Sequence, residues 1–307
     1  MSIDNLDSIP PKQWQSRGQL KTLLGRSIFV VDEGAETLPT IVLLHGFPTA
    51  SWDWVPIWQA LSRNYRLIAL DMLGFGLSEK PNHRNYTIHQ QADIVEALIK
   101  DKQLKKFHVL AHDYGDTVAQ ELLARQVEGC GEGAWLSCCF LNGGLFPETH
   151  RALLTQKLLL SPLGKFLNSL TGFSKFSRNF SSVFGPQSKP TEQELLHFWW
   201  LINFNNGKHI FHNLITYMRD RLEHRERWVN ALQKSTAPLG LINGSVDPVS
   251  GAHMVARYKE LECRLDYLAE LPLIGHYPQV EAPAEVIKHY QEYLESLLTS
   301  NAVASHD

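Results

Sequence analysis

Short apolar runs alternate with helical patterns along most of this chain. Residues 40–44 and 65–70 form two such runs, and a segment of helical character follows each of them. Between residues 88 and 100, apolar side chains stand at positions 88, 92, 95 and 99, the spacing of one helix face. Continuous apolar strands separated by helices are typical of a mostly parallel sheet that is covered on both faces. We therefore expect an α/β fold with a doubly wound sheet.

The alternation is interrupted once. Further strands are predicted at residues 27–32, 107–112 and 135–141, after which residues 149–234 contain only helical and irregular patterns. One helix of this stretch begins at a capping box, Thr191 to Glu194. Strand and helix patterns resume at residues 238–242 and continue to a last helix at 284–298. The prediction is a core of residues 1–148 and 235–307, with a helical lid of residues 149–234 inserted after the sixth strand.

Composition excludes several function classes. The chain has 29 basic and 32 acidic residues, so its charge of −3 gives no general attraction to nucleic acid. Cys138 and Cys139 are adjacent on a predicted strand and are expected to be buried thiols. Neither a metal-binding spacing nor a glycine-rich phosphate loop is present, so we expect no metal and no cofactor. Without an apolar leader or a run of about 18 apolar residues, a cytoplasmic protein is predicted.

Two segments rich in charged residues are expected to be solvent-exposed surface rather than binding sites. Lysines and an arginine at positions 157, 165, 175 and 178 are interleaved with Leu and Phe, as in helices that lie on a membrane surface. A solvated face of the lid is the preferred interpretation, so membrane contact is not expected. Residues 219–227 mix both charge signs and are predicted to form an exposed helix. The sequence does not indicate an oligomeric state.

The most informative residue is Asp113. It follows the strand at 107–112 and is flanked two positions away by Ala111 and Gly115. Small residues at this spacing indicate a nucleophile elbow, a tight turn that exposes its central side chain at the top of a sheet. A carboxylate at that point can attack an electrophilic carbon and form an ester with the enzyme. The alternative interpretation of Asp113 alone is a helix cap.

Two more residues complete a candidate triad. Asp247 follows the strand that ends at residue 242, and His276 follows the last strand. The chain order of nucleophile, acid and histidine is the one expected for a hydrolase of this architecture. His276 would activate a water molecule, and Asp247 would hold its tautomer. Taken singly, Asp247 is better explained as a turn residue before a proline, and His276 as a core or solvated histidine.

Backbone donors are expected near the elbow. The turn His45-Gly46-Phe47-Pro48 can aim the amide of Phe47 toward Asp113, and the amide of Tyr114 would be its partner in an oxyanion hole. The alternative is an ordinary tight turn. No competing serine elbow exists, because neither Ser78 nor Ser245 is followed by the required small residue.

These motifs resemble those of a known family. Across nearly its whole length the chain is similar to the α/β-hydrolase superfamily, and within it to the branch of epoxide hydrolases and haloalkane dehalogenases. It resembles most closely the subgroup of mesoderm-specific transcript proteins and their bacterial relatives. The segments that carry this resemblance are residues 45–48, 112–121 and 142–151. The resemblance implies the α/β-hydrolase fold and an Asp-His-Asp triad, but it implies the substrate poorly.

The departures from each branch bear on the reaction. Haloalkane dehalogenases usually carry Trp after the nucleophile and often Asn in the early loop, where this chain has Tyr114 and Phe47. Epoxide hydrolases usually bring two lid tyrosines to the epoxide oxygen; Tyr217 is one candidate, or else a packed helix residue, and no second is found.

We therefore expect an enzyme that forms an alkyl ester on Asp113 and hydrolyses it with water. An epoxide hydrolase acting on a small apolar substrate is the first hypothesis, and a haloalkane dehalogenase is the alternative. A non-catalytic ligand-binding protein is a third possibility, because the charged residue Asp116 is unusual so close to an elbow. Candidate substrate-binding residues are His45, Tyr217, Trp199 and Trp200, although the lid aromatics could simply pack the lid onto the core.

Overall fold

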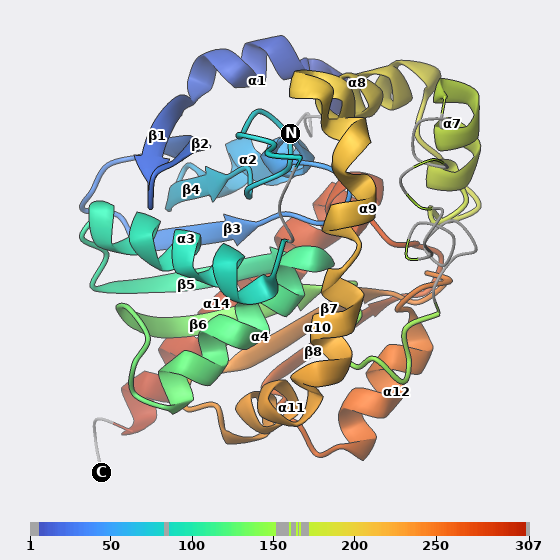
Figure 1. Ribbon diagram of the computed structural model, residues 1–307. Helices are drawn as coiled ribbons and strands as arrows, with labels where there is room; N and C mark the ends of the chain where they lie inside the picture. Colours follow the sequence, from blue (N-terminus) through green and yellow to red (C-terminus); the bar gives the residue numbers. More distant parts are fainter. Residues whose placement is uncertain are drawn as a thin grey trace.

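A single eight-stranded sheet organises the chain. The computed structural model describes residues 6–82, 86–151, 160, 164, 166 and 172–304. Its strand order is β1-β2-β4-β3-β5-β6-β7-β8 (Figure 1). The first two strands run antiparallel to their neighbours, and all pairs from β4 to β8 are parallel. The strands are β1 (Gln19–Leu23), β2 (Arg26–Glu33), β3 (Thr40–Leu44), β4 (Arg66–Leu70), β5 (Lys106–His112), β6 (Ala134–Leu141), β7 (Leu239–Gly244) and β8 (Tyr267–Leu271).

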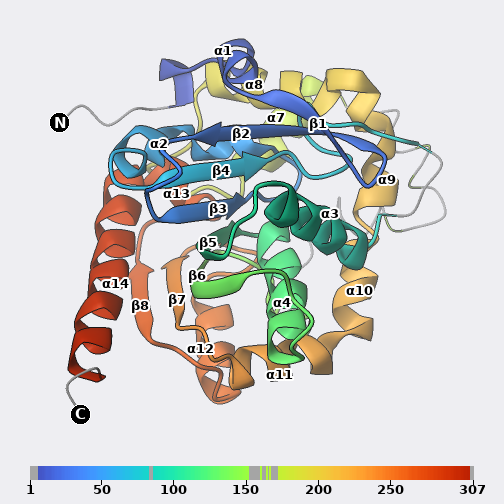
Figure 2. The same ribbon diagram turned by 90° about the vertical axis from the view of Figure 1, so that its left-hand side faces the viewer.

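Helices cover both faces of this sheet. Figure 2 shows α2 and α14 on one face and α3 and α4 on the other. The core helices are α1 (Pro11–Arg17), α2 (Val55–Leu61), α3 (Ile88–Asp101), α4 (Tyr114–Val127), α12 (Ala252–Glu260), α13 (Pro278–Glu281) and α14 (Pro283–Ala304). Short 3-10 helices lie at Leu6–Ser8, Ser51–Trp54 and Phe204–Ile210. Because both faces are covered, every residue of β3, β4 and β7 is buried, which explains their largely apolar sequences.

Between β6 and β7 the described residues contain helices and no strand. These are α7 (Phe173–Ser181), α8 (Glu192–Asn203), α9 (Phe211–Leu214), α10 (Tyr217–Glu223) and α11 (Arg225–Lys234), which we call the helical insertion. The predicted capping box is confirmed, because Thr191 and Glu194 bond reciprocally at the start of α8. The α/β-hydrolase architecture predicted from the sequence is therefore correct.

The division into core and lid stays a prediction. The last helix of the insertion, α11, packs along α4 of the core, and the indole of Trp228 donates to Glu121 at 2.9 Å. Its contacts therefore group α11 with the core helices that cover the sheet. On α7, Lys175 and Arg178 are exposed and Phe176 and Phe180 are buried, whereas positions 157 and 165 lie outside the described residues.

Several local predictions can be checked directly. Cys138 and Cys139 are buried free thiols, as expected from their place on a strand. The prediction of an exposed helix at residues 219–227 is correct only in part. Arg219, Leu222, Glu223 and Glu226 are exposed, but the segment spans two helices, α10 and α11. Arg221 is only 2% exposed, and Arg227 bonds to the buried Glu121. None of the described helices combines the length and apolar character that crossing a bilayer requires.

Candidate active site

The turn between β5 and α4 presents Asp113. This residue has φ 46° and ψ −101°, a conformation that a non-glycine residue rarely adopts. The turn is tight enough that a Cβ atom on Gly115 would lie 2.2 Å from the carbonyl oxygen of Leu44. The Asp113 side chain does not cap α4 but accepts a hydrogen bond from the amide of Phe47 at 3.0 Å. The helix-cap alternative is thus excluded, and the strained geometry is that of an elbow.

His276 lies beside this carboxylate and is held by Asp247. The Nε2 atom of His276 is 3.8 Å from Asp113 Oδ1, and its Nδ1 atom donates to Asp247 Oδ2 at 2.7 Å. Asp247 is itself fixed by the amides of Val249 and Ser250 and by the Ser250 hydroxyl. The structure therefore brings together the three residues that the sequence analysis proposed as a triad.

Sequence reasoning missed Asn142. Its side-chain amide donates to Asp247 Oδ2 at 3.0 Å and to the carbonyl oxygen of Gly244 at 3.0 Å. Its own oxygen accepts from the amide of Gly244 at 2.5 Å. These bonds tie the ends of β6 and β7 together and orient the acid from behind. The position of Asn142 directly after a buried strand could have indicated this role.

Arg221 is a second residue that the sequence analysis missed. It lies on α10, and its Nε atom donates to the Thr117 hydroxyl at 2.8 Å. One terminal nitrogen donates to the carbonyl oxygen of Asp113 at 3.4 Å and lies 3.8 Å from Asp113 Oδ1. The guanidinium also lies over the ring of Tyr217, 4.6 Å from its centroid. The helical insertion thus places a buried cation against the candidate nucleophile.

These neighbours determine the charge of the site. Burial opposes ionisation of Asp113, but His276 and Arg221 outweigh it and lower the pKa of the carboxyl well below its usual range. Burial also opposes a charged His276, but Asp247 and Asp113 outweigh it and raise the pKa of the ring well above its usual range. The resting site therefore favours an imidazolium between two carboxylates. Among the described residues, no group of three His, Cys, Asp or Glu side chains could hold a metal ion.

The structure does not support a ligand-binding role for His45. Its Nδ1 atom donates to the Gly46 carbonyl oxygen at 2.8 Å, and its Nε2 atom accepts from the amide of Met72 at 3.0 Å. Both ring nitrogens are used by the backbone, and burial lowers the pKa of the ring. His45 thus holds the turn that carries Phe47. The second expected donor, Tyr114, lies one residue after Asp113 at the start of α4.

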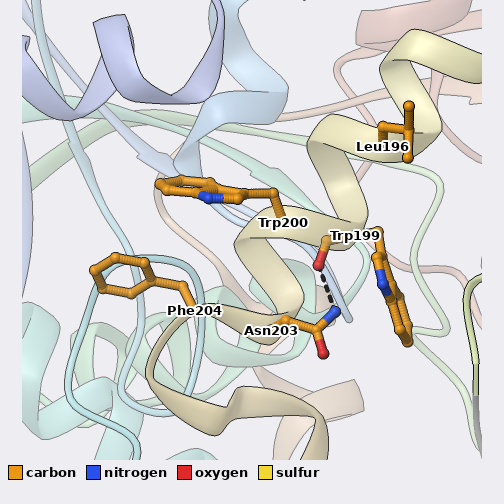
Figure 3. Close-up of a pocket in the computed structure, with 5 residues that line it drawn as sticks. All are labelled: Leu196, Trp199, Trp200, Asn203 and Phe204. Carbon is orange, nitrogen blue, oxygen red and sulfur yellow. Dashed lines mark hydrogen bonds between the residues drawn. The ribbon is translucent and has the colours of Figure 1, made fainter.

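Trp199 and Trp200 do not face the triad either. They line an open pocket of about 470 Å³ on α8, together with Leu196, Asn203 and Phe204 (Figure 3). Their ring contacts are with Phe173, Phe176 and Phe204. The neighbouring Phe198 is one of the buried residues of α8, and it packs against Trp52 and Tyr277. The face of α8 that carries Phe198 therefore packs against the core, and the face that carries Trp199 and Trp200 does not. The sequence pattern did not distinguish these two faces.

Tyr217 does lie at the site. Its ring packs edge-on against Tyr114 at 4.9 Å and lies 6.0 Å from the ring of Phe47. It is fully buried, and its hydroxyl has no hydrogen-bond partner among the described residues. Burial raises the pKa of this hydroxyl, so Tyr217 is protonated. An available buried donor therefore lies close to the elbow.

Glu281 fastens the loop of His276 to the helical insertion. One carboxylate oxygen accepts from the amides of Gly185 and Gly275 at 2.7 and 2.9 Å, and the other accepts from the amide of Tyr277 at 2.9 Å. The amide of His276 also donates to the carbonyl oxygen of Val183 at 2.9 Å. The histidine is thus positioned by both the core and the insertion.

Comparison with known proteins agrees with the fold described above. A family profile described as alpha/beta hydrolase fold matches residues 39–132. The human mesoderm-specific transcript homolog protein is 43% identical and aligns with 94% of this chain and 91% of its own length. The putative hydrolase LipZ of Mycobacterium tuberculosis is 36% identical, with 94% of this chain and 97% of its own length aligned.

Solved structures share the fold. The crystal structure of the haloalkane dehalogenase DbeA-M1 loop variant from Bradyrhizobium elkanii superposes with a TM-score of 0.79 at 20% identity. The alignment covers 94% of this chain and 99% of that one. At this identity the likeness concerns the fold alone. Together with the full-length relatives, these findings show that the chain is a member of the α/β-hydrolase family.

Proposed function

We propose that this α/β hydrolase opens epoxides through an alkyl ester on Asp113. A carboxylate oxygen of Asp113 attacks a ring carbon, and the carbon–oxygen bond of the epoxide breaks with its electron pair on oxygen. That oxygen takes the proton of Tyr217. His276 then gives up its proton, which restores the phenol of Tyr217, and the neutral ring takes a proton from a water molecule that attacks the ester carbonyl. The ester collapses to a diol and a free carboxylate, with His276 protonated as at the start.

The observation that carries this proposal is the set of contacts of the Asp113 carboxylate. One oxygen accepts from the Phe47 amide, as the carbonyl oxygen of an ester would in the second step. The other lies 3.8 Å from His276 Nε2, which puts the general base beside the ester that water would attack. A serine hydrolase would have a hydroxyl at this turn, so the residue type itself favours attack on a saturated carbon.

Tyr217 favours an epoxide over a halide. A departing alkoxide needs a proton, which the buried hydroxyl of Tyr217 can supply, whereas a halide needs N–H donors. The resemblance places such donors at the positions of Tyr114 and Phe47, and neither side chain here carries an N–H group. The helical insertion would act as the lid that keeps bulk water away during the first step.

Trapping of the ester is the decisive experiment. His276→Ala removes the general base, so we expect stoichiometric addition of styrene oxide to Asp113 when the intact protein and its peptides are weighed by mass spectrometry. Asp113→Asn serves as the control that cannot form the ester. If the His276→Ala protein gains no mass from any of a panel of epoxides and halogenated alkanes, the covalent mechanism is wrong.

The same panel separates the two chemistries. Formation of diols without release of halide supports an epoxide hydrolase, and release of halide from 1-bromobutane supports a dehalogenase. A protein that binds these compounds and returns them unchanged, with Asp113→Asn binding equally well, would be the non-catalytic ligand-binding protein.

A further inference from the structure

Two consecutive glycines make room for Arg221. A Cβ atom on Gly144 would lie 2.5 Å from Arg221 Nη1 and 2.7 Å from His150 Nδ1, the atom to which this Nη1 donates. The preceding Gly143 makes the same kind of room for the buried carboxylate of Asp116. The segment after β6 is therefore shaped to hold a guanidinium under the elbow.

Arg221 contacts both partners of the proposed first step. Its guanidinium lies 3.8 Å from the Asp113 carboxylate and over the face of the Tyr217 ring. Tyr217 stands one helical turn before Arg221 on α10. Its three nitrogens are occupied by Thr117, His150 and the Asp113 carbonyl oxygen, so the guanidinium is fixed in place. A fixed cation between a nucleophile and an acid can interact with the negative charge at either site.

We propose that Arg221 is a positioning residue that stabilises the reaction's negative charge first on Asp113 and then on Tyr217. In the first step the Asp113 oxygen bonds to carbon, and its charge passes to the epoxide oxygen. This oxygen takes the phenolic proton, so the charge ends on the Tyr217 ring beneath the guanidinium. Tyr217 then regains its proton from His276, and Asp113 regains its charge when the ester is hydrolysed. One tyrosine and one arginine thereby replace the two tyrosines that the resemblance implies.

This inference rests on the proposed function and deepens it. Other titratable groups around Asp113 must be considered in any pH experiment. Burial lowers the pKa of His112 to about 3, so this ring is neutral, and burial raises the pKa of the Asp116 carboxyl. The remaining charged neighbours are His276 and its partner Asp247. Once His276 is replaced, Arg221 is the principal cation left beside Asp113.

The test uses the ester trap. The rate of ester formation with styrene oxide is measured against pH in His276→Ala and in His276→Ala/Arg221→Gln. Loss of the guanidinium should slow ester formation about 10- to 100-fold, the range expected when a buried charged partner is lost. The acidic limb of the pH–rate profile is the range in which the rate falls because Asp113 becomes protonated. Loss of the guanidinium should move this limb upward by about one to three pH units, because nothing then offsets the effect of burial on the pKa of Asp113. Arg221→Lys keeps a charge and should keep the low limb.

Two further variants separate charge from folding. Arg66→Gln removes another buried arginine, which pairs with Asp32 at 2.8 Å at the opposite end of the sheet. This variant should leave the acidic limb of the pH–rate profile unchanged. Gly144→Ala should displace the guanidinium and shift the limb in the same direction as Arg221→Gln, which also covers the case in which that variant does not fold.

The outcomes distinguish the two proposals. An unchanged limb in Arg221→Gln and in Gly144→Ala overturns the role of Arg221, as does an equal shift in Arg66→Gln. Absence of the ester in His276→Ala alone overturns the proposed function instead.

Discussion

Replacement of Asp247 by asparagine tests the triad more sharply than truncation, because the structure predicts which way the new amide will point. Asp247 Oδ2 faces three neighbouring residues that donate hydrogen bonds, His276, Asn142 and Ser250. Oδ1 accepts only from the amide of Val249 at 2.8 Å. The asparagine oxygen should therefore occupy the Oδ2 position, with its NH₂ group toward Val249.

This orientation keeps the tautomer of His276 and removes only the charge of its partner. A hydrogen bond to a charged group contributes about 1.5–3 kcal/mol, so ester hydrolysis should slow about 10- to 150-fold. The unpaired amide of Val249 should cost about 1–3 kcal/mol of unfolding free energy. Ester formation should be much less affected, since Asp113 and Tyr217 are unchanged, so the ester should accumulate.

Single-turnover kinetics with quenched-flow mass spectrometry would measure both steps, and urea unfolding would measure stability. A loss of about 10⁴-fold in ester hydrolysis would instead indicate the wrong tautomer, as in a serine protease carrying the equivalent change. That result would refute the orientation argued from the number of donors at each oxygen.

Three further predictions follow from the same geometry. Esterification of Asp113 removes one of the two carboxylates that raise the pKa of His276. The acidic limb of ester hydrolysis should therefore lie below the pH at which the ring titrates in the resting enzyme. If the kinetic limb coincides with an NMR titration of the ring in the resting enzyme, the prediction is wrong. Neither oxygen of the Asp116 carboxyl has a hydrogen-bond partner in the part of the chain that the structure describes, and burial raises the pKa of this group. Asp116→Asn should therefore gain stability relative to the wild type as the pH rises from about 4, by about 1.4 kcal/mol per unit of pKa shift. Denaturant unfolding at pH 4 and pH 7 measures this difference, and a difference that does not grow would show that the pKa of Asp116 is not raised. Gly115→Ala should lower the unfolding free energy by about 1–3 kcal/mol or more and abolish ester formation. The control is Gly172→Ala, which should do neither, because a Cβ atom there meets nothing within 4 Å. Normal ester formation in Gly115→Ala would mean that the elbow tolerates a side chain.

Much of the site could be predicted because it lies at strand ends. Asp113, Asp247 and His276 follow the strands β5, β7 and β8, and the carboxyl ends of strands in a parallel sheet meet at one edge. Their meeting needed no knowledge of distant contacts. The elbow was visible in the same way, because the spacing of small residues around Asp113 is a local requirement of the turn.

The helical insertion could not be predicted in the same detail. Arg221 stands in a run of charged residues that has the local pattern of a solvated helix, and only the approach of α10 to the elbow buries it. Trp199 and Trp200 were expected to line the site because aromatic residues are common in apolar pockets, but the rotation of α8 turns Phe198 inward instead. Helix rotation and placement depend on tertiary packing, which periodicity alone does not determine.

The bonds of Glu281 join the helical insertion to the loop that carries the general base. Residues 183–188 of the insertion and the loop of His276 share one carboxylate, so neither can be displaced without straining the other. If a substrate enters between them, access to Asp113 and alignment of the general base are mechanically linked. A conformational change that admits a substrate here would withdraw the water-activating ring, and hydrolysis would wait until the insertion had returned.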